Sequence, residues 1–193
     1  MEVHLHRAST RAVLLTIALA PACAPLATFR PPSAFMGGRT MEMGLGAATV
    51  SPRPYVDERW LYAGQTWFTV RAAPWLHLSA ISTFDPRAVA LGGAATALAI
   101  RADRFVGGAE VELGYGWAAA GLPMALRLFE EHWLYTAPRV GNFGIDPAFG
   151  LPIGISLHLH GGAFARFEYQ TSWVRLQAFN QRDHVAAALA VQW

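Results

Sequence analysis

The sequence predicts an all-β protein built as one antiparallel up-and-down barrel of ten strands. Apolar residues recur at alternate positions along successive segments, and glycine and proline punctuate those segments. Only 15% of the 193 residues are charged, whereas soluble domains carry about 25%. Every basic residue is an arginine, because the chain contains no lysine, although a water-facing surface usually carries many lysines. Twelve prolines and eighteen glycines argue against a bundle of long helices.

The C-terminal segment His184–Trp193 shows the alternation clearly and ends on an aromatic residue. One face of this predicted strand is apolar, and the other carries mainly alanine. The apolar face comprises Val185, Ala187, Leu189, Val191 and Trp193. A closing strand of this kind resembles the last strand of bacterial outer-membrane β-barrels. The resemblance implies a transmembrane barrel in the outer membrane of a Gram-negative bacterium, in contact with outer-membrane lipid. It also implies that the barrel-assembly machinery recognises the C-terminal strand.

Residues 1–22 are predicted to be a signal peptide. Two arginines precede the apolar run Ala12–Ala20, which is too short to span a bilayer, since spanning takes about 20 residues. The stretch that follows, Ala20–Cys23, resembles a bacterial lipobox and implies lipid attachment at Cys23. A plain cleaved signal peptide is the alternative. No internal disulfide is predicted, because Cys23 is the only cysteine.

Residues 23–38 are predicted to be a flexible tether, and residues 39–193 the barrel. Three prolines lie in this tether among small and polar residues, and proline-rich segments of this kind stay extended. We therefore expect the tether not to pack against the barrel.

Ten segments are assigned as strands, and the connections between them alternate in length. Eight strands are the alternative, because Trp133–Ala137 is short. The predicted strands are Met41–Ala48, Trp60–Ala72, Trp75–Phe84, Ala88–Arg101, Phe105–Trp117, Met124–Leu128, Trp133–Ala137, Ile153–His160, Ala165–Trp173 and His184–Trp193. Tight turns are predicted near Pro74, Asp103, Glu131 and Gly161, and long loops over Ser51–Arg59, Arg139–Gly150 and Ala178–Asp183. Short turns at one end and longer loops at the other are typical of outer-membrane barrels.

Alternation alone does not say which face of the strands points outward. A soluble lipocalin-like barrel would place the apolar face inside and is the structural alternative. The polar face here consists mainly of Gly, Ala and Ser with scattered charges, which is too sparsely charged for a water-exposed exterior. An arginine facing lipid costs about 2–4 kcal/mol at the membrane midplane. We therefore expect the apolar face to contact lipid and the charged residues to point into the lumen.

The predicted lumen contains a network of ion pairs, since buried charges require partners. Its members are Arg71, Glu110, Glu112, Arg127, Arg166 and Glu168, joined by three lumen histidines, His77, His158 and His160. Small barrels fill their interior with side chains, which favours a narrow, largely filled lumen. A narrow selective conduit lined by the same charges is the alternative. His158 and His160 could share a metal, but no third ligand is apparent, so neither a metal nor a cofactor is predicted.

An enzymatic function is disfavoured by the sequence. Ser156, His158 and Glu112 could form a hydrolase site like that of lipid-deacylating outer-membrane enzymes, but that family's motif is absent. Omptin proteases, which are also ten-stranded, use Asp and His near the extracellular rim. Asp85 and the pair Asp183–His184 lie at the corresponding ends here, although strand ends commonly carry such residues. The net charge of +2 and the lack of a basic run argue against nucleic acid as a partner.

The function that the sequence favours is a structural or interaction role through the extracellular loops. Small-solute or lipid transport is the first alternative, and an outer-membrane hydrolase is the second.

Overall fold

The computed structural model describes residues 28–32, 34–35, 38–50, 61–84, 89–143, 147–176 and 178–193. Its strands are β1 (Met41–Val50), β2 (Leu61–Ala73), β3 (Leu76–Phe84), β4 (Val89–Arg101), β5 (Phe105–Gly114), β6 (Trp117–Gly121), β7 (Met124–Phe129), β8 (His132–Thr136), β9 (Arg139–Phe143), β10 (Pro147–His160), β11 (Ala163–Leu176) and β12 (Ala178–Gln192). No helix among these residues is long and apolar enough to cross a membrane.

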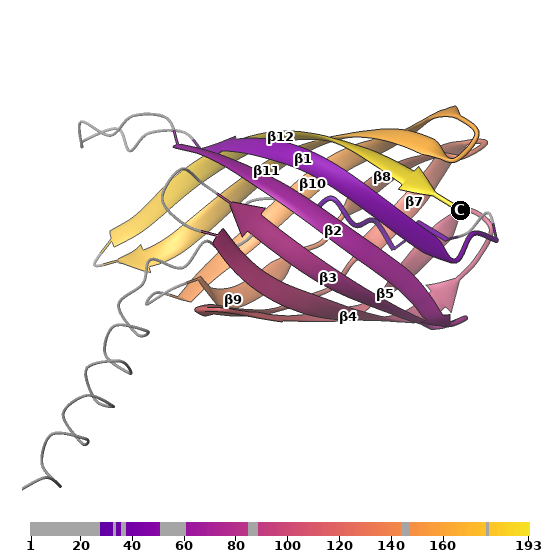
Figure 1. Ribbon diagram of the computed structural model, residues 1–193. Helices are drawn as coiled ribbons and strands as arrows, with labels where there is room; N and C mark the ends of the chain where they lie inside the picture. Colours follow the sequence, from indigo (N-terminus) through magenta and orange to yellow (C-terminus); the bar gives the residue numbers. More distant parts are fainter. Residues whose placement is uncertain are drawn as a thin grey trace, which may run out of the picture.

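All strand pairs are antiparallel, and the sheet closes because β1 pairs with both β2 and β12. Strongly tilted strands form the resulting cylinder (Figure 1). The twelve segments make a closed barrel of ten strands, because two strands are each interrupted once. β6 and β7 both pair with β5, and β8 and β9 both pair with β10. The predicted all-β barrel of ten strands is confirmed, and the alternative of eight strands is wrong.

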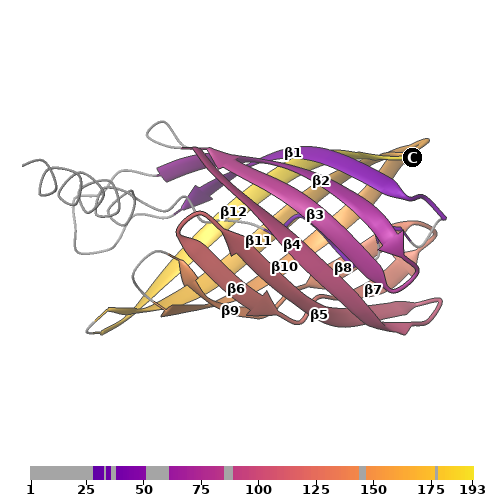
Figure 2. The ribbon, with the colours of Figure 1, turned by 60° about the horizontal axis from the view of Figure 1, so that its bottom comes forward.

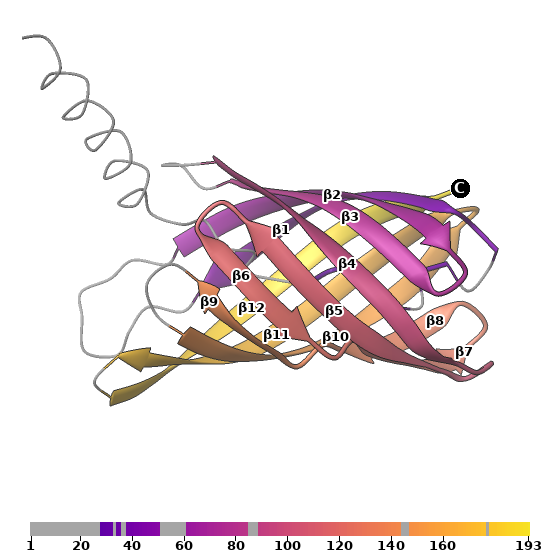
Figure 3. The same cartoon turned by 90° about the horizontal axis from the view of Figure 1, so that it is seen from below.

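Prolines interrupt the two divided strands at facing positions. Pro123 separates β6 from β7, and Pro138 separates β8 from β9. Proline cannot donate to a ladder hydrogen bond, so it ends regular pairing locally. Backbone hydrogen bonds close the gap, because Leu122 donates to Pro138 O at 2.9 Å and Gly108 donates to Pro123 O at 3.0 Å. β6 lies beside β9 along this part of the wall (Figure 3).

Three boundaries differ from the sequence prediction. The segment Phe105–Trp117 is not one strand: the chain turns at Tyr115 and at Gly116, whose φ is +77°. That turn resets the alternation, so Trp117 points into the lumen and is buried. Arg139–Gly150 is not a long loop, because β9 and β10 occupy it except for residues 144–146. Ala178–Asp183 is not a loop either, because β12 begins at Ala178.

The predicted tight turns are present at one end of the barrel, after Ala73, Arg101, Phe129 and His160. The C-terminus lies at the same end (Figure 2), where Trp193 O accepts hydrogen bonds from the backbone of Thr40 and Met41. The predicted loop Ser51–Arg59 lies outside the described residues.

Large apolar side chains cover the outside of the barrel, and polar side chains are buried inside. Leu45 is 58% exposed and Leu189 is 63% exposed, whereas Glu42 and Arg166 are both fully buried. This arrangement confirms the predicted orientation. The lipocalin-like alternative is wrong, because its apolar face would line the interior. Because side chains alternate along each strand, apolar ones point to the outside of the barrel and polar ones point into the lumen.

Described residues that precede β1 lie inside the barrel. In Figure 1 the indigo trace that precedes β1 runs within the cylinder of strands. We call residues 28–32 and 34–35 the lumen segment; Phe29 is 0% exposed and Phe35 is 1% exposed. The expectation that this part of the chain stays unpacked is therefore wrong for the lumen segment. The charged and aromatic residues interspersed among its prolines give it contacts that a solvated linker lacks. The predicted signal peptide, residues 1–22, lies outside the described residues, and so does Cys23.

Candidate functional site

The candidate site is the barrel lumen, and its charged groups form two clusters. The first, which we call the wall cluster, consists of Glu42, Trp67, Arg166 and Gln192. Arg166 on β11 donates two hydrogen bonds to Glu42 on β1, from Nη1 at 2.8 Å and from Nη2 at 2.5 Å. Trp67 Nε1 and Gln192 Nε2 donate to the same carboxylate at 2.7 and 2.6 Å. The cluster therefore joins four strands around one carboxylate, with the paired geometry that suits a guanidinium group.

The second cluster, which we call the segment cluster, joins the lumen segment to the wall. Glu168 on β11 accepts three hydrogen bonds from the segment. The donors are Thr28 N at 2.8 Å, Thr28 Oγ1 at 2.6 Å and Phe29 N at 3.1 Å. Tyr135 Oη donates to the same carboxylate at 3.2 Å. Glu168 therefore holds the segment by hydrogen bonds to two backbone amides and one hydroxyl group.

Arg30 is the charged side chain that the lumen segment contributes to this cluster. Its Nη2 atom forms an ion pair with Glu112 and lies 3.4 Å from Glu110 Oε1. Arg139 Nη1 approaches Glu112 Oε2 to 3.7 Å, and Thr96 Oγ1 donates to Glu110 at 2.5 Å. Both carboxylates are buried, and burial without a partner would be costly for either. Arg30 therefore supplies charge compensation that the wall alone provides only in part.

Two aromatic rings of the segment complete its packing. The Phe29 ring stacks on Trp67 with a centroid distance of 5.5 Å. It lies so close to Gly46 that a Cβ atom there would be 2.6 Å from the ring. The Phe35 ring packs edge-on against His77 at 4.7 Å. The inner wall leaves room for Phe29 because glycine and alanine occupy that side of β1 and β12.

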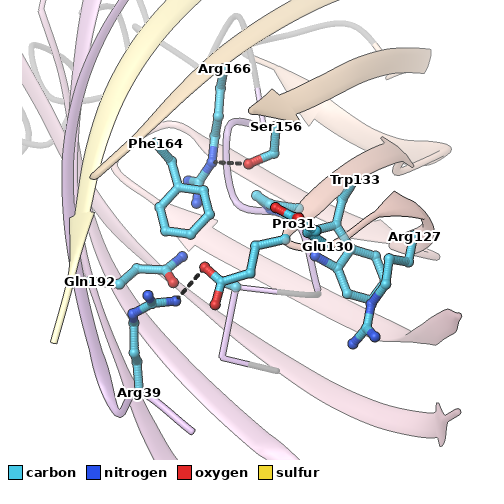
Figure 4. Close-up of a pocket in the computed structure, with 11 residues that line it drawn as sticks. Pro31, Arg39, Arg127, Glu130, Trp133, Ser156, Phe164, Arg166 and Gln192 are labelled. Atoms are coloured by element: carbon cyan, nitrogen blue, oxygen red, sulfur yellow. Dashed lines mark hydrogen bonds and ion pairs between the residues drawn. The ribbon is translucent and has the colours of Figure 1, made fainter. Parts of the chain in front are cut away.

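Between the lumen segment and the tight turns lies a cavity of about 250 Å³. Pro31 and Ala34 of the segment close one side of it, and Trp133, Phe164 and Arg166 belong to its wall (Figure 4). Arg39 and Glu131 pair near its mouth at 3.0 Å. The cavity therefore separates the segment from the tight turns at this end of the lumen.

Other predicted lumen charges have partners different from those expected. Glu110, Glu112 and Glu168 were expected to meet Arg71, Arg127 and Arg166. Arg166 instead binds Glu42. Arg71 donates to the carbonyl oxygens of Phe35 and Gly38 at 3.4 and 3.3 Å, and Arg127 lies over the Trp133 ring at 5.1 Å.

The three predicted lumen histidines differ in their surroundings. His77 is buried against Phe35. His158 is partly buried near the mouth, where its Nε2 atom lies 3.5 Å from Glu131 Oε2 and 2.8 Å from Gly161 O. His160 is exposed beyond a β-bulge at the end of β10, so the prediction that it lines the lumen is wrong. Within the described part of the chain, no three metal-ligating side chains come together.

The candidate hydrolase residues do not share one set of contacts. Ser156 Oγ accepts a hydrogen bond from Arg166 Nε at 3.4 Å, His158 contacts Glu131, and Glu112 pairs with Arg30. Asp183 accepts a hydrogen bond from Tyr169 at 2.8 Å. The adjacent His184 contacts Ser172 at 2.9 Å inside the barrel. Asp85 lies outside the described residues.

The apolar side chains of the predicted closing strand point outward from β12. Leu189 and Trp193 are both exposed, and Trp193 lies 6.5 Å from the Phe68 ring. β12 lies between β1 and β11 and completes the barrel.

Sequence reasoning missed Arg30, Glu42 and Arg139. Glu42 lies on the small-residue face of the first strand, so the alternation of that strand could have assigned it to the lumen. Arg139 was assigned to a loop because Pro138 precedes it. Arg30 lies in the proline-rich segment, and nothing in its local sequence indicates burial.

The strand pairings define a closed antiparallel β-barrel of ten strands, with apolar side chains outside and charged side chains inside. No protein-family model matches the chain, and no curated protein does. Among solved structures, the chain is similar to the KdgM porin in complex with disordered oligogalacturonate. That likeness has 9% identity and a TM-score of 0.48, and it covers 79% of this chain and 99% of the porin. Neisserial surface protein A shares 9% identity at a TM-score of 0.37, with 81% and 97% coverage.

Proposed function

We propose that the protein is an integral barrel of the Gram-negative outer membrane whose lumen is closed at rest. The observation that carries this proposal is the filled interior, in which the lumen segment is bound to opposite sides of the wall. The protein then has a structural or interaction role, which it performs through the loops at the barrel end opposite the tight turns. Small-solute transport would require the segment to move.

Location and closure can be tested together. Membrane fractionation should recover the protein with the outer membrane, and its gel migration should differ between unboiled and boiled samples. Purified protein in planar lipid bilayers should show no steady single-channel current. A stable open conductance from the full chain would contradict the proposed closure, and recovery in the soluble fraction would contradict the location.

We propose that the barrel-assembly machinery recognises the outward face of β12 and its terminal Trp193. Replacing Trp193 by serine should reduce the amount of assembled, heat-modifiable barrel in cells. The same purified variant should refold in detergent as the parent chain does, because the lumen contacts are unchanged. Equal losses in cells and in detergent would attribute the effect to stability instead.

We also propose that Cys23 carries lipid. Metabolic labelling with a fatty acid should mark the parent chain and should not mark the Cys23→Ser variant. Equal labelling of both chains would contradict lipid attachment at this residue.

A further inference from the structure

We propose that the lumen segment is a detachable plug, and that its withdrawal opens a conduit selective for small cations. This inference rests on the proposed closed barrel and extends it with a second state. The segment is attached to the wall by contacts of its own side chains and by hydrogen bonds from its backbone amides to Glu168. No strand of the described sheet includes it. Wall strands are held by backbone ladders with neighbours on both sides, so the segment can separate while the barrel stays intact.

The backbone of the segment is held in an unfavourable conformation. Phe29 has φ of +48°, in the left-handed region that bulky residues rarely adopt. Such a conformation persists where surrounding contacts impose it. The contacts surround Phe29. Its amide donates to Glu168, its carbonyl oxygen accepts from Arg166, and its ring stacks on Trp67. Release of the segment would relieve this strain, which lowers the cost of opening.

A cavity already leads from the turn end of the barrel to the segment. The cavity of about 250 Å³ reaches Pro31 and Ala34 from the turn end. Beside Phe29 one side of the inner wall carries the small residues Ala48, Ala186 and Ala188, and the Trp67 ring lies on the other side. Removing the two aromatic rings of the segment would therefore open space along the alanine side of the wall.

The charge of the emptied wall determines which ions the conduit favours. Among the described residues, the buried wall charges are the carboxylates of Glu42, Glu110, Glu112 and Glu168 and the guanidinium groups of Arg139 and Arg166. Arg166 stays paired with Glu42. Withdrawal of the segment removes Arg30 from Glu110 and Glu112, and it removes three of the hydrogen bonds to Glu168. Among these buried wall groups, four carboxylates then stand against two guanidinium groups, and a narrow constriction with that excess favours cations. Arg71 and Arg127 lie near the tight turns, where they are partly exposed.

The test uses the full chain carrying Phe29→Ser, Arg30→Ser and Phe35→Ser, refolded and recorded in planar bilayers. Arg104→Ser is the matched control, because it removes one positive charge at an exposed turn. We expect the triple variant to conduct and to prefer K⁺ over Cl⁻ several-fold, measured by the reversal potential across a KCl gradient. Adding Glu110→Gln and Glu112→Gln should reduce that preference while conduction persists.

The outcomes separate this inference from the proposed function. A folded, silent triple variant overturns the plug and leaves the closed barrel standing. Equal conduction by the parent chain and the triple variant overturns the closed barrel itself. Conduction with anion preference overturns the cation assignment.

Hydrogen exchange on the parent chain gives a test that requires no variant. Amides of Thr28, Phe29 and Ala34 should exchange at least tenfold faster than amides in the middle of β11 and β12. Exchange as slow as that of the wall would show that the segment does not detach, and would overturn the inference even if the triple variant failed to fold.

Discussion

The wall cluster and the segment cluster lie in the same lumen and use the same chemistry, yet they connect different parts of the chain. Glu42 and Arg166 join β1 to β11, and both belong to strands that hydrogen-bond ladders already hold. Arg30 joins Glu110 and Glu112 to a segment that lies outside the sheet. An ion pair of the first kind maintains the barrel, whereas one of the second kind holds a piece that can leave.

Breaking the wall cluster should have the largest effect on stability. Glu42→Gln removes the carboxylate that pairs directly with the buried Arg166, and breaking a buried pair in this way costs about 3–5 kcal/mol of unfolding free energy. Urea unfolding in lipid vesicles measures this loss. Glu130→Gln, the same chemical change at an exposed turn residue, is the control and should leave the midpoint unchanged. Equal midpoints for the two variants would show that the cluster does not stabilise the barrel.

The outer wall should be the next most sensitive region, because its apolar side chains face lipid in the membrane location that we propose. Leu45→Arg places a charge in the middle of β1, and we expect a loss of about 2–4 kcal/mol in the same assay. Leu159→Arg, near the turn end of β10, should cost about 0–1 kcal/mol. Equal costs for the two substitutions would contradict a membrane whose midplane lies at the level of Leu45.

Breaking the segment cluster should cost less than breaking the wall cluster. Arg30→Met removes charge-assisted hydrogen bonds worth about 1.5–3 kcal/mol, and water entering behind a displaced segment can solvate Glu110 and Glu112. We expect a shift in the urea midpoint clearly smaller than that of Glu42→Gln. A shift as large as that of Glu42→Gln would mean that the segment is an inseparable part of the barrel.

The smallest effect is expected at the mouth of the cavity. Arg39 pairs with Glu131 at 3.0 Å, but both side chains are partly exposed, and such pairs contribute about 0–1 kcal/mol. Arg39→Gln should therefore leave the unfolding midpoint nearly unchanged at physiological salt. A loss comparable to that of Arg30→Met would show that the mouth is less accessible to water than the structure indicates.

Local sequence patterns predicted the strands well where they were continuous and poorly where tight turns or prolines divided them. The run from Phe105 to Trp117 looks like one strand, because a two-residue turn preserves an apparent alternation across the hairpin. Pro138 suggested the end of a strand, whereas β9 continues beyond it because its neighbours supply pairing on both sides. Neither outcome is contained in the local pattern, since both depend on which strands lie alongside.

The sequence by itself determined that this chain forms an antiparallel barrel with apolar residues outward. Period-two alternation and a scarcity of charge are properties of each strand alone, and they constrain the surrounding medium directly. Only the tertiary structure decided which buried charges meet, because pairing depends on register and on closure across the lumen. It also decided that the lumen segment, residues 28–32 and 34–35, lies inside. A proline-rich segment has no periodicity to read, and only a complementary wall gives its arginine and its two phenylalanines a place to bind.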